Sequence, residues 1–250
     1  MSRRQRFAAL VASLGLTLSL TGTVLAEPTP AANAMFNAGV AAFRAGDINS
    51  AVDAWAQAAK GGHAMAAYLV GQLYEQGRGV PQSAGTAFHY FQQAAQGGNA
   101  QAAVKVGLVY RDGNKALGVK KNNEKAFEMF EKGALEAWPE AQYYLADMYR
   151  RGLGVPMQRS ESLRWLLLAS EKRYVPACLE LARIHFDGEG VNQDRIKGWS
   201  WLDLANRFVD PADAKTVNAA MDKYSGRMRT GEKDEAKKIA DDWVAKHEGS

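Results

Sequence analysis

Cysteine and histidine are scarce in this sequence. Cys178 is the one cysteine among 250 residues, and a lone thiol cannot form an intramolecular disulfide. The four histidines are His63, His89, His185 and His247, and neither an HExxH motif nor a CxxC pair is present. Zinc sites commonly use those spacings. The sequence therefore predicts no metal site and no cofactor, and stability must come from packing.

A large excess of charge of one sign is also lacking. The formal net charge is +4, but Arg3, Arg4 and Arg6 supply three of these charges. Residues 27–250 carry 28 basic residues against 27 acidic ones, so no surface that neutralises nucleic-acid phosphates is expected. With 47% hydrophobic and 23% charged residues, the composition is that of a folded protein.

The N-terminus has the pattern of a secretory signal peptide. Three arginines precede an uncharged apolar run over residues 7–25, and the small residue Ala26 precedes the expected cleavage site. We therefore expect residues 1–26 to be removed, residues 27–33 to form a proline-containing linker, and the mature protein to be periplasmic or secreted. An uncleaved membrane anchor is the competing interpretation, and the choice between Sec and twin-arginine export stays open. After cleavage, no stable membrane insertion is expected.

A four-residue glycine motif recurs along the middle of the chain. Gly-Arg-Gly-Val at 77–80 returns at 152–155 and 188–191 as Gly-x-Gly-Val, and a form with three extra residues covers 113–119. The first glycines are 36, 39 and 36 residues apart, so the period is 36 with one insertion. Glycines before a helix can also cradle a phosphate, but recurrence at a fixed period favours a turn that requires glycine.

The residues around each turn have the spacing of packed helices. Positions 11, 7, 6, 4 and 3 before the first glycine are apolar, aromatic or small in every copy, which places them on one helical face. Position 6 holds only glycine or alanine, so a neighbouring helix is expected to approach closely there. A second apolar segment follows each turn, and each repeat is thus predicted to be a helical hairpin.

The pattern A-x-x-x-L-G-x-L-Y-x-x-G-x-G-V resembles that of Sel1-like repeats, and the shorter hairpin near residues 39–58 resembles a tetratricopeptide repeat. The resemblance covers residues 34–206, as one tetratricopeptide-like hairpin and four Sel1-like repeats. It implies an all-α fold, a right-handed superhelical α-solenoid of stacked helical hairpins. Residues 207–250 are expected to form a C-terminal helical cap, with one helix beginning at Asp210-Pro211 and another at Thr230.

The exposed face of the first helix in each repeat is the candidate partner-binding surface, because the resemblance implies that these helices line a concave groove. The predicted partner-binding residues are Tyr68, Gln72, Glu75, Leu108, Arg111, Tyr143, Asp147, Arg150, Arg183 and Phe186. Arginines mixed with acids and aromatic groups suit the recognition of a peptide or protein segment. An ordinary solvated helix face is the alternative.

No catalytic residue is predicted. Cys178 follows a small packed alanine and has no histidine at helical spacing, so an inert, largely buried thiol is expected. His63 and His185 occupy positions that recur in sister repeats, and His185 replaces a tyrosine, so packing roles are expected for both. Four lysines cluster around the inserted loop, which is expected to be solvated, the alternative being a docking patch for an acidic partner or an anionic membrane. These lysines are Lys115, Lys120, Lys121 and Lys125.

The predicted function is that of an exported, non-enzymatic scaffold or regulatory adaptor. The resemblance implies a protein or peptide partner in the cell envelope, such as a sensor or an assembly protein. The first alternative is a protein that binds or hydrolyses peptidoglycan, although Asp187 with Glu189 lies in a repeated turn and Asp241 with Asp242 lies in the end cap. A structural, oligomerising module is the second. The sequence leaves open the oligomeric state and any shift of the stack across the insertion.

Overall fold

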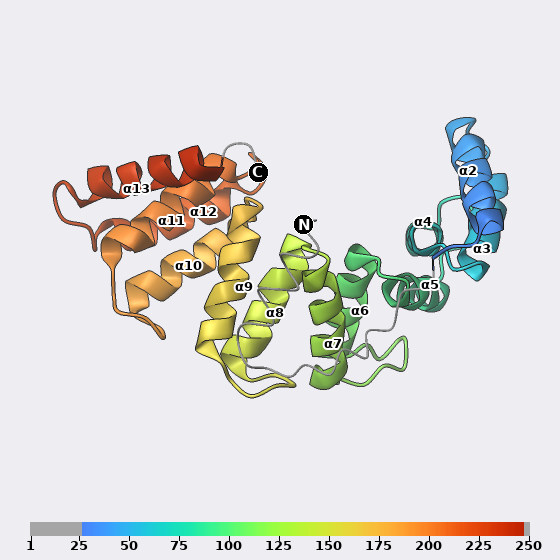
Figure 1. The fold of residues 1–250 in the computed structure, drawn as a ribbon, viewed down its shortest axis with the longest axis horizontal. Helices are drawn as coiled ribbons and strands as arrows, with labels where there is room; N and C mark the ends of the chain where they lie inside the picture. Colours follow the sequence, from blue (N-terminus) through green and yellow to red (C-terminus); the bar gives the residue numbers. More distant parts are fainter. Residues whose placement is uncertain (1–26, 248–250) are drawn as a thin grey trace, which may run out of the picture.

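A computed structural model of the chain describes residues 27–247; the predicted signal peptide lies outside the described residues. Within this range the protein consists of α-helices and their connections, with one isolated β-bridge. Successive helices pack against one another and follow an arc, an α-solenoid that leaves a hollow between its two halves (Figure 1). No helix in the described part is both long enough and apolar enough to cross a membrane.

The arc is built from helical hairpins in sequence order. The first hairpin pairs α2 (Pro30–Arg44) with α3 (Ile48–Lys60). The four predicted repeats follow as α4 (Ala64–Gln76) with α5 (Ala84–Gln96), α6 (Ala100–Asp112) with α7 (Asn123–Leu135), α8 (Pro139–Arg151) with α9 (Arg159–Glu171), and α10 (Val175–Asp187) with α11 (Arg195–Phe208). The chain ends with α12 (Ala214–Ser225) and α13 (Glu232–His247).

Helix α2 begins earlier than the sequence predicts. Residues 30–33, assigned to a linker, form its first turn. The Thr29 hydroxyl caps the helix by accepting a hydrogen bond from the Ala32 amide at 3.1 Å. Pro30 suits the first turn because its missing N–H would have no partner there. Ala32 is buried against Gly61, so the expected linker is shorter by four residues.

The recurring glycine turn ends one helix and packs on the preceding repeat. Gly77 stops α4 in the left-handed conformation, with φ of 66°, and its N–H bonds back to the helix. Gly79 has φ of 73°, and a Cβ there would clash with Ile48 at the start of α3. In the third repeat, a Cβ on Gly154 would lie 2.5 Å from the carbonyl oxygen of Asn123 at the start of α7. Backbone conformation and close approach therefore account for both glycines.

The insertion at 113–119 is looped out of the stack. Asn114 and Val119 form an antiparallel bridge, with N···O distances of 2.7 and 2.9 Å. Beyond it, the Asn122 amide donates to the Tyr110 carbonyl at 2.8 Å, and the other three repeats make the same bond at 2.9 to 3.0 Å. The three extra residues therefore leave the connection between the two helices of this hairpin unchanged.

Close helix packing occurs where the sequence predicts it. A Cβ on Gly71 would lie 2.7 Å from the Phe91 ring, and one on Gly107 would lie 2.6 Å from the Phe130 ring. In the third and fourth repeats, the same position holds the fully buried Ala146 and Ala182. The small residue lets an aromatic side chain of the second helix lie against the backbone of the first.

The C-terminal cap departs from the expected hairpin in its details. Helix α12 begins at Ala214 rather than at Asp210-Pro211, because residues 211–213 form a turn. Both α12 and α13 pack against α11, and α12 also covers the end of α10. Ala236 and Ala240 of α13 are buried, whereas Ile239 on the same helix is 37% exposed.

Candidate partner-binding surface

The predicted partner-binding residues lie on α4, α6, α8 and α10, the first helices of the four repeats. Glu75 is exposed. Most of the others are half-buried, namely Gln72, Leu108, Arg111, Tyr143, Asp147, Arg150 and Arg183. Tyr68 is 8% exposed, and its hydroxyl accepts a hydrogen bond from Gln72 at 3.0 Å.

Phe186 does not belong to this surface. It is 0% exposed, and its ring stacks on Tyr224 of α12 at a centroid distance of 4.2 Å. Its position corresponds to Glu75, Arg111 and Arg150 of the earlier repeats, where another repeat follows. After the last repeat the cap follows instead and covers this position. The prediction that a partner contacts Phe186 is therefore wrong.

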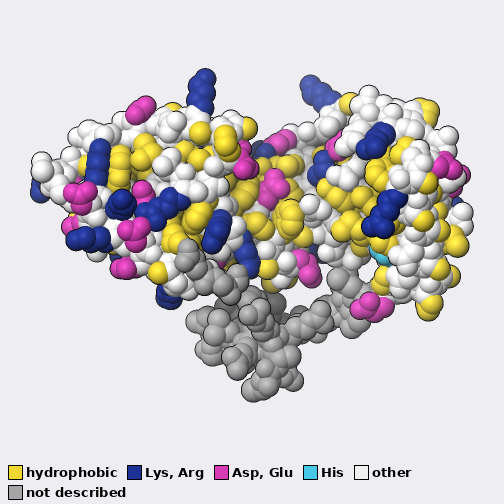
Figure 2. Space-filling model, turned by 90° about the horizontal axis from the view of Figure 1, so that it is seen from above, with side chains coloured by type: hydrophobic (Ala, Val, Ile, Leu, Met, Phe, Trp, Pro, Cys, Tyr) yellow, Lys and Arg dark blue, Asp and Glu magenta, His cyan; other side chains and the backbone are white. Residues whose placement is uncertain are grey.

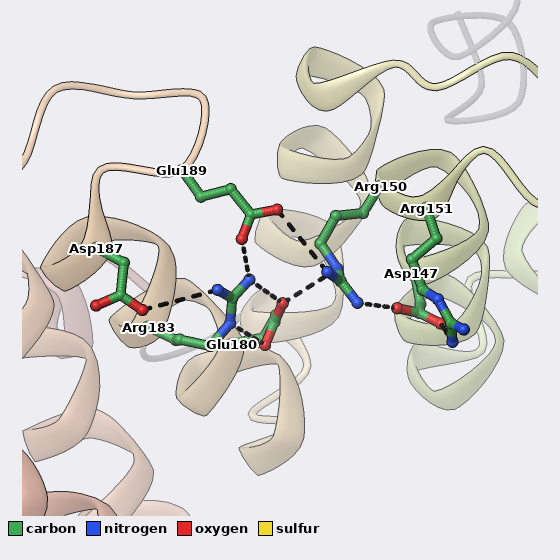
Figure 3. A network of polar contacts seen from close by, with 7 residues as sticks. All are labelled: Asp147, Arg150, Arg151, Glu180, Arg183, Asp187 and Glu189. Atoms are coloured by element: carbon green, nitrogen blue, oxygen red, sulfur yellow. Dashed lines mark hydrogen bonds and ion pairs between the residues drawn. The ribbon is translucent and has the colours of Figure 1, made fainter.

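Arg150 and Arg183 are engaged by acids of the protein itself (Figure 3). Arg183 contacts Glu180 at 2.8 Å and Glu189 at 2.6 Å. Arg150 contacts Asp147 in its own helix and reaches Glu180 of the next repeat at 3.4 Å. The hydrogen bonds and negative charges of Glu180 and Glu189 raise the pKa of Arg183 above its ordinary value. Arg150 therefore connects two neighbouring repeats, Arg183 pairs within its own repeat, and neither guanidinium stands unpaired on this face.

The same kind of contact joins the earlier repeats. Glu75 of α4 pairs with Lys105 of α6 at 2.9 Å. Arg111 forms an ion pair with Asp112 at 2.8 Å, and its guanidinium lies over the Tyr144 ring of α8 at 5.2 Å. Charged and aromatic side chains therefore bridge α4 to α6, α6 to α8, and α8 to α10 along one face.

Tyrosines of the third repeat and of the turn that leads into α10 meet in the middle of this face. The Tyr143 ring lies 5.5 Å from Tyr144 and 5.7 Å from Tyr174, which precedes α10. Burial raises the pKa of all three hydroxyls. The predicted set omits Tyr144 and Tyr174. Tyr144 is at position 8 before the turn glycine, where other repeats have the charged residues Lys105 and Glu180. Charged residues at this position are the sequence signal that Tyr144 does not belong to the core.

Two open clefts adjoin the face. One has a volume of about 340 Å³, lies between α2 and α4, and is lined by side chains that include Phe43 and Leu69. The other has a volume of about 440 Å³ and lies between the start of α10 and the connection from α11 to α12. Its lining includes Tyr174, Leu179 and Phe208. Apolar side chains of a partner could enter either cleft.

The single cysteine and two of the histidines have packing roles, as predicted. Cys178 is fully buried, and burial raises the pKa of its thiol to about 12. His63 caps α4 by accepting a hydrogen bond from the Ala66 amide at 3.2 Å and stacks on Phe36. His185 is half-buried, and burial lowers its pKa. Within residues 27–247, no group of three or more His, Cys, Asp or Glu side chains is placed to hold a metal ion.

The lysines of the insertion lie where the sequence predicts solvent. Lys115, Lys120, Lys121 and Lys125 are all exposed. Lys125 lies over the Tyr110 ring at 5.2 Å. A docking role for this loop stays a prediction.

Comparison with known proteins agrees with this geometry. The Sel1 repeat family matches four consecutive segments, residues 64–99, 100–137, 139–174 and 175–207. A solved Sel1 repeat protein from Oxalobacter formigenes is similar at 30% identity and a TM-score of 0.54, covering 70% of each chain. A comparison with curated protein sequences finds no match.

The structure of c5321, a protective antigen of uropathogenic Escherichia coli with an SLR fold, is similar at a TM-score of 0.72 and 22% identity. The alignment covers 86% of this chain and 46% of the antigen, so this chain spans less than half of the antigen's length. This likeness concerns the fold. Sel1 repeats form a scaffold for protein–protein interaction. With four matched repeats that coincide with four observed hairpins, the chain belongs to the Sel1 repeat family.

Proposed function

We propose that the protein is an exported, non-enzymatic scaffold that binds a protein or peptide partner in the cell envelope through the face of α4, α6, α8 and α10. The scaffold role follows from the family, and export follows from the pattern of residues 1–26. The tyrosines and the half-buried polar side chains described above line this face. Such groups provide contact area together with hydrogen-bonding capacity.

The observation that carries the proposal is the set of contacts between successive repeats. The pairs Glu75–Lys105 and Arg150–Glu180 each join two first helices, and Arg111 joins α6 to Tyr144. These contacts hold the face in one arrangement before any partner arrives. A preorganised surface loses less conformational entropy on binding, so more of the contact energy remains as affinity.

The peptidoglycan hydrolase alternative finds no support at its candidate residues. Asp187 contacts Arg227 at 3.1 Å, and Glu189 contacts Arg183 at 2.6 Å. Both carboxylates are therefore engaged in ion pairs rather than directed at a substrate. A general acid or base must be within reach of the substrate proton that it transfers, and neither residue is placed for that task.

Site-specific photocrosslinking in cells tests the proposed function. A photoreactive amino acid replaces Leu108 or Tyr143 on the face, and Leu135 of α7, which is 61% exposed, serves as the matched control. We expect a discrete adduct with another protein from the face positions and none from the control. Adducts absent from both face positions, or equally strong at Leu135, would contradict the proposal. The intact mass of the exported form should correspond to a chain that begins at Glu27.

Charge reversal at Arg111, Arg150 and Arg183 is a poor test of the same idea. Each reversal would place two negative charges together, because Asp112, Glu180 and Glu189 are the present partners. Loss of a partner would then not be distinguishable from a disturbed stack. Crosslinking leaves these contacts in place.

A further inference from the structure

One charged side chain on the face stands apart from the others. The four first helices carry six acids and five basic residues, apart from His185. Ten of these eleven make ion pairs with other described residues, and Glu140 is the eleventh, which makes none. The paired residues are Glu75, Lys105, Arg111, Asp112, Asp147, Arg150, Arg151, Glu180, Arg183 and Asp187.

Glu140 shares one face of α8 with Tyr143 and Tyr144, which follow it by three and four residues. It lies in the first turn of α8 and is half-buried. Its negative charge raises the pKa of Tyr68 on α4, of Tyr144 on α8 and of Tyr174 before α10, in each case adding to a larger effect of burial. Glu140 therefore lies within electrostatic reach of hydroxyls that the superhelix brings in from separate repeats. We call Glu140, Tyr143, Tyr144 and Tyr174 the tyrosine surface.

The rings of the tyrosine surface suit a cation. The Tyr143 ring lies between those of Tyr144 and Tyr174, at 5.5 and 5.7 Å. Arg111 already lies over Tyr144 at 5.2 Å, so the protein itself places a guanidinium on one of these rings. Arg111 is held by its own carboxylate, Asp112, and does not pair with Glu140. A carboxylate beside aromatic rings is a favourable site for a Lys or Arg side chain.

The tyrosine surface continues into the cleft of about 440 Å³ at the end of the molecule, because Tyr174 lines both. Leu179 and Phe208 form part of the cleft wall, and Arg173 also lines it, with its guanidinium over the Phe208 ring at 5.2 Å. Asp210 and Asp213 also line it, and neither makes an ion pair with another described residue. Seen from above, this side of the molecule shows hydrophobic side chains with acidic and basic ones among them (Figure 2).

We propose that the tyrosine surface and this cleft together bind an extended basic segment of a partner protein, with a Lys or Arg side chain at Glu140 and an apolar side chain in the cleft. This inference rests on the proposed function and adds the chemistry of the partner. Charge complementarity supports it, since three acids without an ion pair to another described residue (Glu140, Asp210 and Asp213) border the path, against one such basic residue, Arg173, and the basic residues of the four first helices are already paired.

Selection from a displayed library of random twelve-residue peptides tests the inference. The purified protein, its Glu140→Gln variant and its Glu140→Lys variant are each used as the target. Glu124→Gln is the matched control, because Glu124 is an exposed acid at the opposite end of the neighbouring helix α7. With the native protein we expect enriched peptides to carry Lys or Arg near an apolar residue. Circular dichroism checks that every variant keeps its helical content.

Binding of the most enriched peptide is then measured by fluorescence anisotropy. Glu140→Gln should weaken binding about tenfold, and Glu124→Gln should leave it unchanged. Glu140→Lys should select peptides that lack the basic residue, and Leu179→Ala should reduce the preference for the apolar residue. Enrichment without basic residues, no enrichment at all, or equal binding by Glu140→Gln and native protein would overturn the inference.

The two proposals fail separately. If photocrosslinking at Tyr143 captures a partner whose bound segment carries no basic residue, the scaffold function stands and the inference about Glu140 falls. If neither face position captures a protein in cells, the proposed function falls even where basic peptides bind the purified protein.

Discussion

Arg150 and Glu180 come from the first helices of neighbouring repeats, and the Nε and Oε1 atoms of the two side chains lie 3.4 Å apart (Figure 3). Glu180 also pairs with Arg183 in its own helix at 2.8 Å. One carboxylate thus links a contact within a helix to a contact between repeats. Because both side chains are largely shielded from solvent, the link is stronger than an isolated surface ion pair.

Arg150→Gln should lower the free energy of unfolding by about 1 kcal/mol, because it removes contacts to Asp147, Glu180 and Glu189. Urea unfolding of this variant, of Glu180→Gln and of the double variant gives the coupling energy. We expect a coupling of at least about 0.5 kcal/mol. Arg164→Gln, which removes an ion pair within α9, is the control. A coupling energy of zero between Arg150 and Glu180 would refute the role of this pair in joining two repeats.

Gly107→Ala should destabilise the protein by about 1 to 3 kcal/mol, because the added methyl group would lie 2.6 Å from the Phe130 ring in a filled core. Gly85→Ala is the matched control, since a Cβ there meets nothing within 4 Å. The control should keep or raise the melting temperature, as alanine favours helix. Equal melting temperatures for the two variants would contradict the close approach.

Ala137→Gly should raise the free energy of unfolding by about 1 kcal/mol, because Ala137 has φ of 57° and a Cβ is unfavourable in that conformation. Gly98 occupies the corresponding turn of an earlier repeat, with φ of 88°. Gly98→Ala should therefore change stability in the opposite direction. Chemical unfolding measures both changes. A lower free energy of unfolding for Ala137→Gly would contradict the inferred backbone strain at Ala137.

Stability should decrease as the pH falls from about 7.5 to 5. Burial lowers the pKa of His63 and His185 in the folded state, and the positive charge of Lys197 adds to the effect at His185 against the opposing charge of Asp194. As the pH falls, the histidines of the unfolded chain therefore become protonated at a higher pH than those of the folded protein. The stability contributed by the neutral histidines is complete above an unfolded pKa of 6.5 and is lost as pH falls through the lower folded pKa.

Melting temperatures at pH 8 and pH 5 measure this effect. The double variant His63→Asn and His185→Tyr uses residues that fill the same positions in sister repeats. Its melting temperature should fall less between pH 8 and pH 5 than that of the native protein. His89→Gln, on the exposed part of α5, is the control. An equal loss in native protein and double variant would assign the acid sensitivity to other groups.

Much of the candidate site lay beyond sequence reasoning for identifiable reasons. Helical spacing placed Arg150 and Phe186 at equivalent positions, but one lies against the next repeat and the other lies under Tyr224 of the cap. Periodicity describes one helix at a time and carries no information about which element covers it. The same holds for Glu140, whose lack of an ion pair became visible when every other charge on the face had a partner.

By itself, the sequence determined the local features of this protein: the helices, their apolar faces, the glycine turns and the period of 36 residues. These depend on backbone sterics and on spacing within a single repeat. Only the tertiary structure decided which charges are paired, that the insertion is looped out, and that Tyr174 lies against Tyr143 beside an acid without an ion pair to another described residue. Those facts depend on how successive repeats pack against one another, and no single repeat specifies that arrangement.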